Sequence, residues 1–397
     1  MSTRKPVVDW TSDFDHLDPE WTRDPYPIWE ELRKKCPIAH TERFDGVFFP
    51  SRYEDIRTVA YDTEHFSSRR VILREGRPPV PPAPPVTSDP PHHSAHKRMV
   101  LPAFSPKAIE RYAPQTRAIC RELIERLHNK TYCDAAVDYA QQIPVRVIAS
   151  MLGVSVEDNQ RFRRWVHEFL EAGVTDSAVF MRAVEEIKAF FLAEIEKRRV
   201  NRGDDLIGYL LRVRIDEQPL SEGALIGTLR VLLFGGIDTT WSAIGACLWH
   251  IATHSNDRKR LVAEPGLIPT AIEEFLRAYA PVTMAREIVK ETRIGGRAVN
   301  EGEMVLLSFP AANRDPAVFA DPDRVIIDRN PNRHVAFGLG IHRCIGSNLA
   351  RMEMTIALEE WLASFPEFTL AAGREVTWSQ GQVRGPRNLP FVLGPVE

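Results

Sequence analysis

A ten-residue segment near the carboxyl end of the chain combines a cysteine with glycines and basic side chains. It reads FGLGIHRCIG over residues 337–346, with the thiol at Cys344 and a predicted helix directly after it. The glycines let the backbone approach a ligand closely, with N–H groups free to bond a sulfur anion. His342, Arg343 and the helix amino terminus favour a lowered thiol pKa. The loop therefore predicts a thiolate that acts as a nucleophile, a redox group or a metal ligand.

A carboxylate and a guanidinium share one face of a second predicted helix. Glu274 and Arg277 lie three residues apart in IEEFLR, on a helix expected to start near Pro269 and to stop before Pro281. That spacing places the two side chains beside one another. An exposed pair of this kind contributes only about 0–1 kcal/mol. The residues alone leave open whether this is a surface ion pair or part of a buried network.

Polar residues interrupt a largely apolar stretch, VLLFGGIDTTWSAIGACLWHI, over residues 231–251. With Ser221 as its N-cap, the helix would run to about His254 and span roughly 50 Å. A membrane span is the rival interpretation, and Asp238, Arg230 and the central glycines argue against it.

The centre of this helix carries the groups suited to chemistry. Gly235 and Gly236 each cost about 1 kcal/mol in a helix interior, which indicates a local opening or the close approach of a flat ligand. Asp238 would be costly to bury without a partner. Thr239 is placed to bond the carbonyl of Gly235.

The cysteine loop resembles the haem-binding loop of the cytochrome P-450 family, FGxGxHxCxG. The resemblance implies that Cys344 is the axial thiolate ligand of the iron of haem b. It also implies that Phe337 lies against the thiolate side of the haem and that Gly346 lets the next helix pass close to the porphyrin. GGIDTT resembles the oxygen-binding motif of the same family. Gly235 and Gly236 are therefore expected to pass over the haem, with Asp238 and Thr239 as catalytic residues that manage protons.

Two further sets of residues follow from the same resemblance. Glu274 and Arg277 match the ExxR pair of the family, and Arg329 matches the arginine that completes its buried structural triad. The haem propionates are expected to meet four residues: His93, Lys97, Arg286 and His334. Lys97 stands where the family usually has arginine, so a point charge replaces a bidentate contact there.

The implied activity is that of a haem-thiolate monooxygenase that inserts one atom of O2 into a small, largely apolar organic molecule, by hydroxylation or O-demethylation. The chain has neither a GxGxxG dinucleotide motif nor a ferredoxin-like cysteine cluster. Electrons from NAD(P)H are therefore expected through a separate ferredoxin and its reductase. The predicted docking face carries five basic residues: Lys97, Arg98, Lys107, Arg343 and Arg351. A peroxygenase that uses hydrogen peroxide and a non-catalytic haem sensor or carrier are the alternatives, and Asp238 with Thr239 favours the monooxygenase.

The elements that must position these groups are mostly helical. Apolar residues recur every three or four positions from about 92 to 265, whereas turn-rich strand patterns lie near 40–60, 285–310 and 366–397. We expect a mainly α fold with small β-sheets, a single haem domain over residues 1–397, and the haem between two long helices. The proline-rich segment 77–91 is predicted to be an ordered loop. The substrate pocket is expected to include parts of the segment 70–91 together with Val231, Phe234, Gly235, Val282, Thr283, Gln382 and Val383. Arginines flanking the 70–91 loop could hold a carboxylate.

Composition narrows the remaining classes of protein. The net charge is −3, with no long run of like charges, which argues against a nucleic-acid binder. Five cysteines without a CxxC pair and a start without an apolar signal segment favour a cytoplasmic protein that is not bound to a membrane. His92, His93 and His96 have helical spacing that could hold zinc, but the sequence offers no further ligand.

Overall fold

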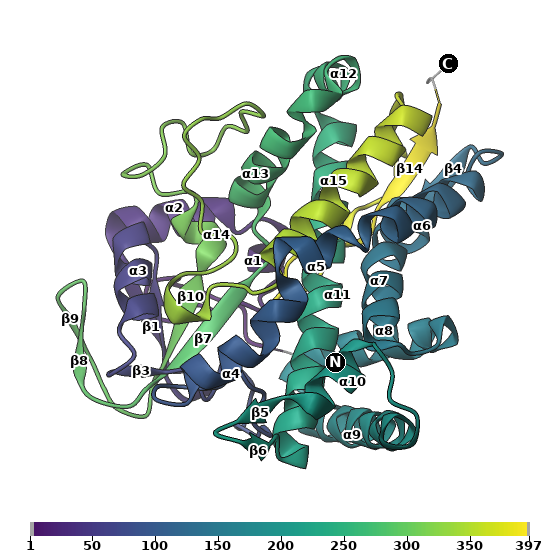
Figure 1. The fold of residues 1–397 in the computed structure, drawn as a ribbon. Helices are drawn as coiled ribbons and strands as arrows, with labels where there is room; N and C mark the ends of the chain where they lie inside the picture. Colours follow the sequence, from purple (N-terminus) through teal and green to yellow (C-terminus); the bar gives the residue numbers. More distant parts are fainter. Residues whose placement is uncertain (1–3, 395–397) are drawn as a thin grey trace.

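The computed structural model describes residues 4–394. Helix α11 (Glu222–Thr253) runs through the centre of the molecule (Figure 1). The Ser221 hydroxyl accepts a hydrogen bond from the Ala224 N–H, and His254 follows the last turn, so both predicted ends are confirmed. Among the described residues, this is the one helix long and apolar enough to cross a membrane. Because 78% of its most apolar window is buried inside the protein, it is a core helix.

The helices packed most extensively against α11 are α7 (Gln142–Leu152), α13 (Ile268–Tyr279) and α15 (Ser347–Ser364). Figure 1 shows α15 lying beside α11. The bounds predicted for the Glu274 helix agree with α13, and α15 is the helix predicted directly after Cys344. The remaining helices are α1 (Pro19–Arg23), α2 (Tyr26–Lys35), α3 (Tyr53–Tyr61), α4 (His93–Val100), α5 (Pro106–Glu110), α6 (Ala113–Glu125), α8 (Asn159–Leu170), α9 (Ser177–Val200), α10 (Leu206–Arg212), α12 (Ser255–Ala263) and α14 (Phe309–Ala312).

The main sheet gathers strands from distant parts of the chain in the order β1-β2-β10-β7-β3. Its strands are β1 (Ile38–Thr41), β2 (Val47–Pro50), β3 (Phe66–Ser67), β7 (Thr283–Ile288) and β10 (Met304–Ser308). Strand β10 runs parallel to β2 and antiparallel to β7, and all five of its residues are buried. Strand patterns predicted near 40–60 and 285–310 therefore form one sheet.

The smaller sheets include a pairing that sequence patterns missed. Strand β4 (Tyr132–Asp134) interrupts a stretch predicted to be helical and pairs with β14 (Pro390–Leu393), which also pairs with β11 (Phe368–Leu370). A three-residue strand has too little periodicity to be recognised, and its partner lies about 250 residues away. The other pairs join β5 (Arg214–Ile215) to β6 (Gln218–Pro219), β8 (Thr292–Ile294) to β9 (Arg297–Val299), and β12 (Thr377–Trp378) to β13 (Pro386–Asn388).

The proline-rich segment 77–91 contains no helix or strand, as predicted. It is nevertheless tied to the core, because the Arg230 guanidinium of α11 donates to the Pro81 carbonyl at 2.6 Å. Within the loop, the Ala83 N–H donates to the Thr87 hydroxyl at 2.7 Å. Gly227 of α11 also lies so close to the loop that a Cβ would come within 2.2 Å of the Pro82 carbonyl oxygen. The loop is therefore held against the amino-terminal half of α11.

Candidate functional site

Helix α11 exposes one narrow row of residues in an otherwise buried segment. Val231, Gly235 and Thr239 are spaced by four and remain accessible, whereas Leu232, Leu233 and most of their other neighbours are buried. A Cβ added at Gly235 would meet no atom within 4 Å. Because residues four apart share a helix face, these three side-chain positions border the same open space.

The structure separates the roles of the two central glycines. A Cβ at Gly236 would lie 2.3 Å from Cδ1 of Ile148, so this glycine is required by the packing of α11 against α7. Gly236 is still partly accessible, so the two glycines differ in packing: the Cβ position of Gly235 is open, whereas that of Gly236 is filled by Ile148. Thr239 Oγ1 donates to the Gly235 carbonyl at 2.7 Å, as predicted.

The cysteine loop is shaped by its glycines. Gly338 and Gly340 have φ values of +73° and +66°, which side-chain-bearing residues rarely adopt, and a Cβ at Gly340 would lie 2.5 Å from the Ala60 carbonyl oxygen. The Cys344 N–H donates to the Phe337 carbonyl at 2.8 Å. The loop thus turns back on itself and presents Cys344, which is solvent-accessible, just before α15.

The pKa of the Cys344 thiol is raised by the protein, whereas the sequence predicts that it is lowered. The protein atoms around Cys344 raise its pKa above the ordinary value, while the Gly346 N–H and the charges of Arg343, Lys97 and Arg351 lower it less strongly. Desolvation outweighs the positive surroundings here. A metal cation bound to the sulfur would reverse the balance, because a coordinating thiol is deprotonated outright.

Positive and imidazole side chains gather beside the loop. The rings of His93 and His342 lie 4.4 Å apart, and His342 Nε2 is 2.9 Å from the Ser68 hydroxyl. Burial and the neighbouring Arg286, His93 and Lys97 lower the pKa of His342 to about 3. Arg286 is 4% exposed and bonds the carbonyl of its neighbour Ala285 at 2.7 Å. Burial lowers the pKa of Arg286 to about 10.

This cluster has no carboxylate bonded to it among the described residues. The nearby Asp89 accepts bonds from the Ser67 hydroxyl and the Ser68 N–H instead. Lys97 donates to the carbonyls of Ile341 and Arg343, so it also braces the cysteine loop. A buried cationic group without an anion suits a ligand that brings its own carboxylates, as a haem does with its propionates.

The propionate contact predicted for His334 is corrected. His334 Nε2 pairs with Glu273 at 2.9 Å, and its Nδ1 accepts from the Ala336 N–H at 3.2 Å, so both ring nitrogens have protein partners. His342 is the imidazole that the structure brings to His93 and Arg286. Sequence analysis named His342 only as a neighbour of the thiol, although its place inside the glycine-rich loop was the available signal.

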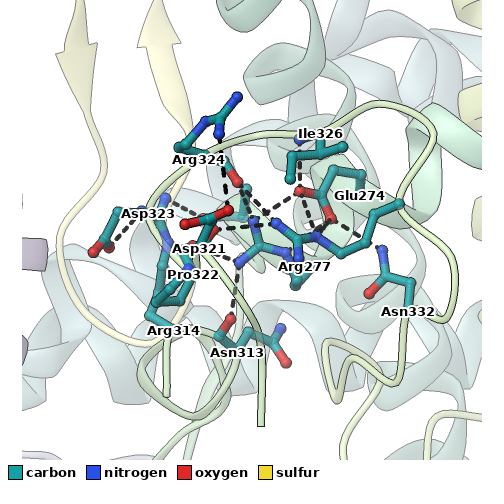
Figure 2. Close-up of polar contacts among 12 residues, drawn as sticks. Glu274, Arg277, Asn313, Arg314, Asp321, Pro322, Asp323, Arg324, Ile326 and Asn332 are labelled. Atoms are coloured by element: carbon teal, nitrogen blue, oxygen red, sulfur yellow. Dashed lines mark hydrogen bonds and ion pairs between the residues drawn. The ribbon is translucent and has the colours of Figure 1, made fainter. Parts of the chain in front are cut away.

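Buried charge in the region of α13 is fully partnered. Arg277 forms two 2.8 Å bonds with Glu274, and Arg329 Nε lies 3.0 and 3.1 Å from the two carboxylate oxygens (Figure 2). The Ile326 N–H and the Asn332 amide donate to the same carboxylate. Glu274 and Arg277 are both 0% exposed. The buried-network interpretation of the ExxR spacing therefore holds in the structure, including Arg329.

Asp238 is fully buried and only partly partnered. Its Oδ1 accepts from Arg387 at 2.8 Å and from the Ser242 hydroxyl at 3.4 Å, while Oδ2 is buried without a bond in the described chain. Burial raises the pKa of Asp238 to about 6, with Arg387 acting in the opposite direction. Arg387 also bonds Glu171 at 2.8 Å. Sequence analysis missed Arg387, because β13 reaches α11 only through the tertiary fold.

The predicted pocket residues fall into two groups. Val231, Phe234 and Gly235 lie on α11, with Phe234 stacked on Phe169 at a ring distance of 4.6 Å. The second group is joined by backbone contacts between 282–283 and 382–383: Val282 forms a bridge with Val383, and the Thr283 N–H donates to the Gln382 carbonyl at 2.9 Å.

The basic residues of the predicted docking face differ in availability. Arg98, Lys107 and Arg343 are exposed. Arg351 instead forms two bonds with Glu273, at 2.6 and 2.7 Å, and Lys97 bonds loop carbonyls. No zinc-like site forms at His92, His93 and His96, since no cluster of three metal-ligating side chains occurs within residues 4–394.

Known proteins are similar to this chain over most of its length. The sequence model of the family described as "Cytochrome P450" matches residues 44–377. The chain is 35% identical over 373 residues to the mycinamicin IV hydroxylase/epoxidase of Micromonospora griseorubida, covering 91% of this chain and 94% of that protein. It is 32% identical over 395 residues to the vitamin D(3) 25-hydroxylase of Pseudonocardia autotrophica, covering 97% and 98%.

Solved structures show the same fold. The cytochrome P-450 PksS of the Bacillus subtilis bacillaene polyketide synthase superposes with a TM-score of 0.89 at 29% identity, covering 96% of this chain and 100% of that one. A cytochrome P-450 from Chondromyces apiculatus gives a TM-score of 0.87 at 33% identity, covering 97% and 99%. These matches agree with the mainly helical fold with small sheets and with the accessible Cys344. They also agree with the cluster around Arg286, to which no carboxylate of the described residues is bonded. The chain is a member of the cytochrome P-450 family, an oxidoreductase of the haem-dependent monooxygenase class.

Proposed function

We propose that this protein hydroxylates or O-demethylates a small, largely apolar organic molecule, with O2 as co-substrate. The observation that carries the proposal is the accessible row Val231, Gly235 and Thr239 on a core helix that packs along α15, the helix that follows Cys344. Relatives named as hydroxylases support the same reaction class. A haem bound at Cys344 would supply the activation of oxygen at its iron.

The residues around the site would bind the haem through its iron and its propionates. Cys344 would ligate the iron, with Phe337 beside the loop and Gly346 at the start of α15. His93, Arg286 and His342 would hold the propionates. Arg286 supplies the positive charge of this cluster, whereas the pKa of about 3 leaves the His342 ring neutral; no carboxylate of the described residues is bonded to Arg286.

Thr239 and Asp238 would handle protons. Thr239 borders the open row, and Asp238 lies one residue further back, with one carboxylate oxygen unbonded in the described chain. A carboxyl group with a pKa of about 6 can both accept and release a proton near neutral pH. Arg387 holds the other oxygen and so orients the group.

Electrons would come from NAD(P)H through a ferredoxin and its reductase in the cytoplasm. The exposed Arg98, Lys107 and Arg343 on and near the cysteine loop offer a positive surface to an acidic partner. Replacing each with glutamate should raise the KM for a ferredoxin surrogate and leave haem content unchanged. Equal KM values in all three variants would contradict this docking face.

The central test uses the purified, haem-loaded protein. Reduced with dithionite and exposed to carbon monoxide, it should show the red-shifted Soret band of thiolate ligation. Cys344→His should lose that band while retaining the overall fold by circular dichroism. A band that survives the substitution would refute Cys344 as the ligand.

A second experiment separates the monooxygenase from the alternatives. Product should form with O2, NAD(P)H and surrogate redox partners, and more slowly with hydrogen peroxide alone. Thr239→Ala should continue to consume NAD(P)H while product falls and peroxide rises. A rate with peroxide alone that equals or exceeds the rate with O2, NAD(P)H and redox partners would favour a peroxygenase, and no product under either condition would favour a haem sensor or carrier.

A further inference from the structure

Two arginines near the proline-rich loop are buried without an acidic partner. Arg74 and Arg230 are each 4% exposed, and no Asp or Glu of the described chain lies within ion-pair distance of either guanidinium. Burial lowers the pKa of Arg74 to about 9 and that of Arg230 to about 10, and the charge of Arg230 contributes to the shift at Arg74. Two positive charges are thus held close together in the interior.

The existing contacts hold these side chains in place but leave their charge uncompensated. Arg74 donates to the carbonyls of Phe169 and Gly173, both at 2.8 Å, while its Nε–H is buried without an acceptor. Arg230 donates to the carbonyls of Pro81 and Pro82. Neutral carbonyls satisfy the N–H groups but carry no negative charge. A buried ion without a counter-ion destabilises the folded state.

Aromatic rings pack against both guanidinium groups. The Phe169 ring lies 4.8 Å from the Arg74 guanidinium carbon and 5.8 Å from that of Arg230. The ring of Phe180 lies 4.0 Å from Arg74. Cation–π contacts offset part of the desolvation and fix the orientation of the charges. The pair is therefore preorganised before any ligand binds.

The neighbouring arginines, unlike Arg74 and Arg230, lie within ion-pair distance of acidic side chains. Arg69 and Arg70 each lie within 4 Å of Glu287, and Arg77 lies 3.4 Å from Asp45. A hollow opens beside Arg74, and apolar residues such as Val71, Leu73 and Val80 line it together with Arg69, Arg70 and Arg77. No Asp or Glu of the described residues lines this hollow, and Arg230 lies outside its wall. Its apolar walls and buried cation suit an amphipathic guest with one negative end.

The pair also lies beside the site of oxidation proposed above. Arg230 precedes Val231 on α11, and Phe169 stacks on Phe234, the residue before Gly235. At 1.5 Å per residue, Arg230 is about 7.5 Å along the helix axis from Gly235. Arg230 therefore lies within about two and a half helical turns of each residue of the row Val231, Gly235 and Thr239.

We propose that Arg74 and Arg230 bind the carboxylate of an organic acid substrate, whose apolar part extends along α11 to the oxidation site. This proposal rests on the monooxygenase function proposed above, because it names the class of molecule that the same pocket takes. It assigns the two arginines to recognition of the substrate rather than to chemistry. The bond they form with the acid is an ion pair, so no atom is transferred at this end.

The test uses ω-phenylalkanoates of increasing chain length and their primary amides, which match in shape and lack the charge. Binding to the haem-loaded protein is measured by calorimetry, and in parallel by the change in the Soret band. The best acid should bind about 10- to 100-fold more tightly than its amide, as expected for charge-assisted hydrogen bonds. Arg230→Gln should abolish that preference, and Arg230→Lys should retain part of it.

Arg69→Gln is the matched control. Arg69 lines the same hollow, but its guanidinium lies 3.8 Å from the Glu287 carboxylate and 63% of its side chain is exposed. This variant should keep the preference of the wild-type protein for acids. Arg74→Gln should lose the preference as Arg230→Gln does, and Arg230→Gln keeps the test valid if Arg74→Gln does not fold.

The proposal is overturned if acids bind no more tightly than their amides over the whole series, if no acid binds, or if Arg69→Gln reduces the preference as much as Arg230→Gln. The proposed function is checked separately by the carbon monoxide spectrum of the same samples. A protein with the thiolate spectrum but no acid preference refutes only the substrate class. A protein with acid preference in calorimetry but no thiolate spectrum refutes only the proposed function.

Discussion

Two fully buried carboxylates, Glu274 and Asp238, are held in opposite ways. Glu274 accepts bonds at both oxygens from Arg277, Arg329 and further donors. Asp238 has one oxygen bonded to Arg387, while the other has no partner in the described chain. A saturated ion fixes the structure around it, whereas a half-bonded acid can change its protonation state without breaking the fold.

The contrast shows how buried charge in this protein can be assigned to structure or to function. The donors to Glu274 come from α13 and from the segment 326–332, so its network joins a helix to an irregular stretch of chain (Figure 2). Arg387 reaches Asp238 from β13 and leaves one carboxylate oxygen without a bond in the described chain. Where a buried charge lacks a protein partner, we infer that a proton or a ligand supplies it.

The largest expected effect comes from breaking the saturated network. Glu274→Ala leaves two buried arginines without their carboxylate and should lower the free energy of unfolding by about 3–5 kcal/mol. Denaturant unfolding and haem content after purification measure the loss. Glu30→Ala, which removes an exposed pair with Lys34 on α2, is the control and should change stability by about 1 kcal/mol or less. A stable and fully haem-loaded Glu274→Ala protein would remove the distinction between the two carboxylates.

The next largest effect should appear in rate rather than stability. Asp238→Asn keeps the shape of the side chain but cannot carry a proton, so product formation should slow by about 10²–10⁴-fold. Its unfolding free energy should stay within about 1 kcal/mol of the wild-type value, since Arg387 retains an oxygen acceptor. Ser242→Ala, which removes only one bond to Oδ1, serves as the control and should slow the reaction much less. Turnover at saturating substrate is the measurement. A large loss of stability with unchanged turnover would make Asp238 structural.

Glu353 is a third buried carboxylate, and it has fewer bonds than either of the first two. Glu353 on α15 is 0% exposed, and neither oxygen has a bond within the described residues. Burial raises its pKa well above the ordinary value, so the folded state keeps a proton that the unfolded state releases above about pH 4.5. Stability should therefore fall as pH rises above that value, by up to about 1.4 kcal/mol per pH unit.

Glu353→Gln should flatten that slope. The measurement is the unfolding free energy from pH 5 to pH 8 in the variant and the wild-type protein. Glu291→Gln, at an exposed position, is the control and should leave the slope unchanged. Equal slopes in all three proteins would mean that Glu353 is ionised in the folded state.

The smallest expected effect concerns the partner of Asp238. The positive charge of Arg387 lowers the pKa of Asp238, so removing it should raise that pKa further above about 6. In Arg387→Gln, the acid limb of the pH–rate profile should move upward by about one pH unit or less. Arg387→Lys keeps the charge and should restore most of the wild-type profile. A limb that stays in place in Arg387→Gln would exclude Asp238 as the titrating group.

Local patterns were sufficient to predict the elements that carry the site. The capping serine Ser221 and the apolar run after it defined α11, and the i, i+3 spacing of Glu274 and Arg277 defined a shared face. The resemblance of the cysteine loop identified the family and marked Cys344. These features are contained in short, contiguous stretches of sequence, where spacing alone fixes which side chains are neighbours.

Contacts between distant segments were not predictable in the same way. The pairing of β4 with β14 depends on strands too short to show a period. The assignment of a cluster position to His334 was wrong because Glu273 and Ala336 take both of its ring nitrogens. The different packing of Gly235 and Gly236 could not be predicted, because Ile148, which packs against only one of them, comes from another helix.

The family, the cysteine loop and the central helix could be predicted from the sequence, because close spacing along the chain constrains these features directly. Which buried charges are compensated depends on the tertiary fold. The fold brings Arg329 to Glu274 and Arg387 to Asp238, and it leaves Arg74 and Arg230 without an acid among the described residues. Whether a buried charge is paired depends on groups that meet across hundreds of residues of sequence, and its cost is set by the low dielectric of the interior where they meet.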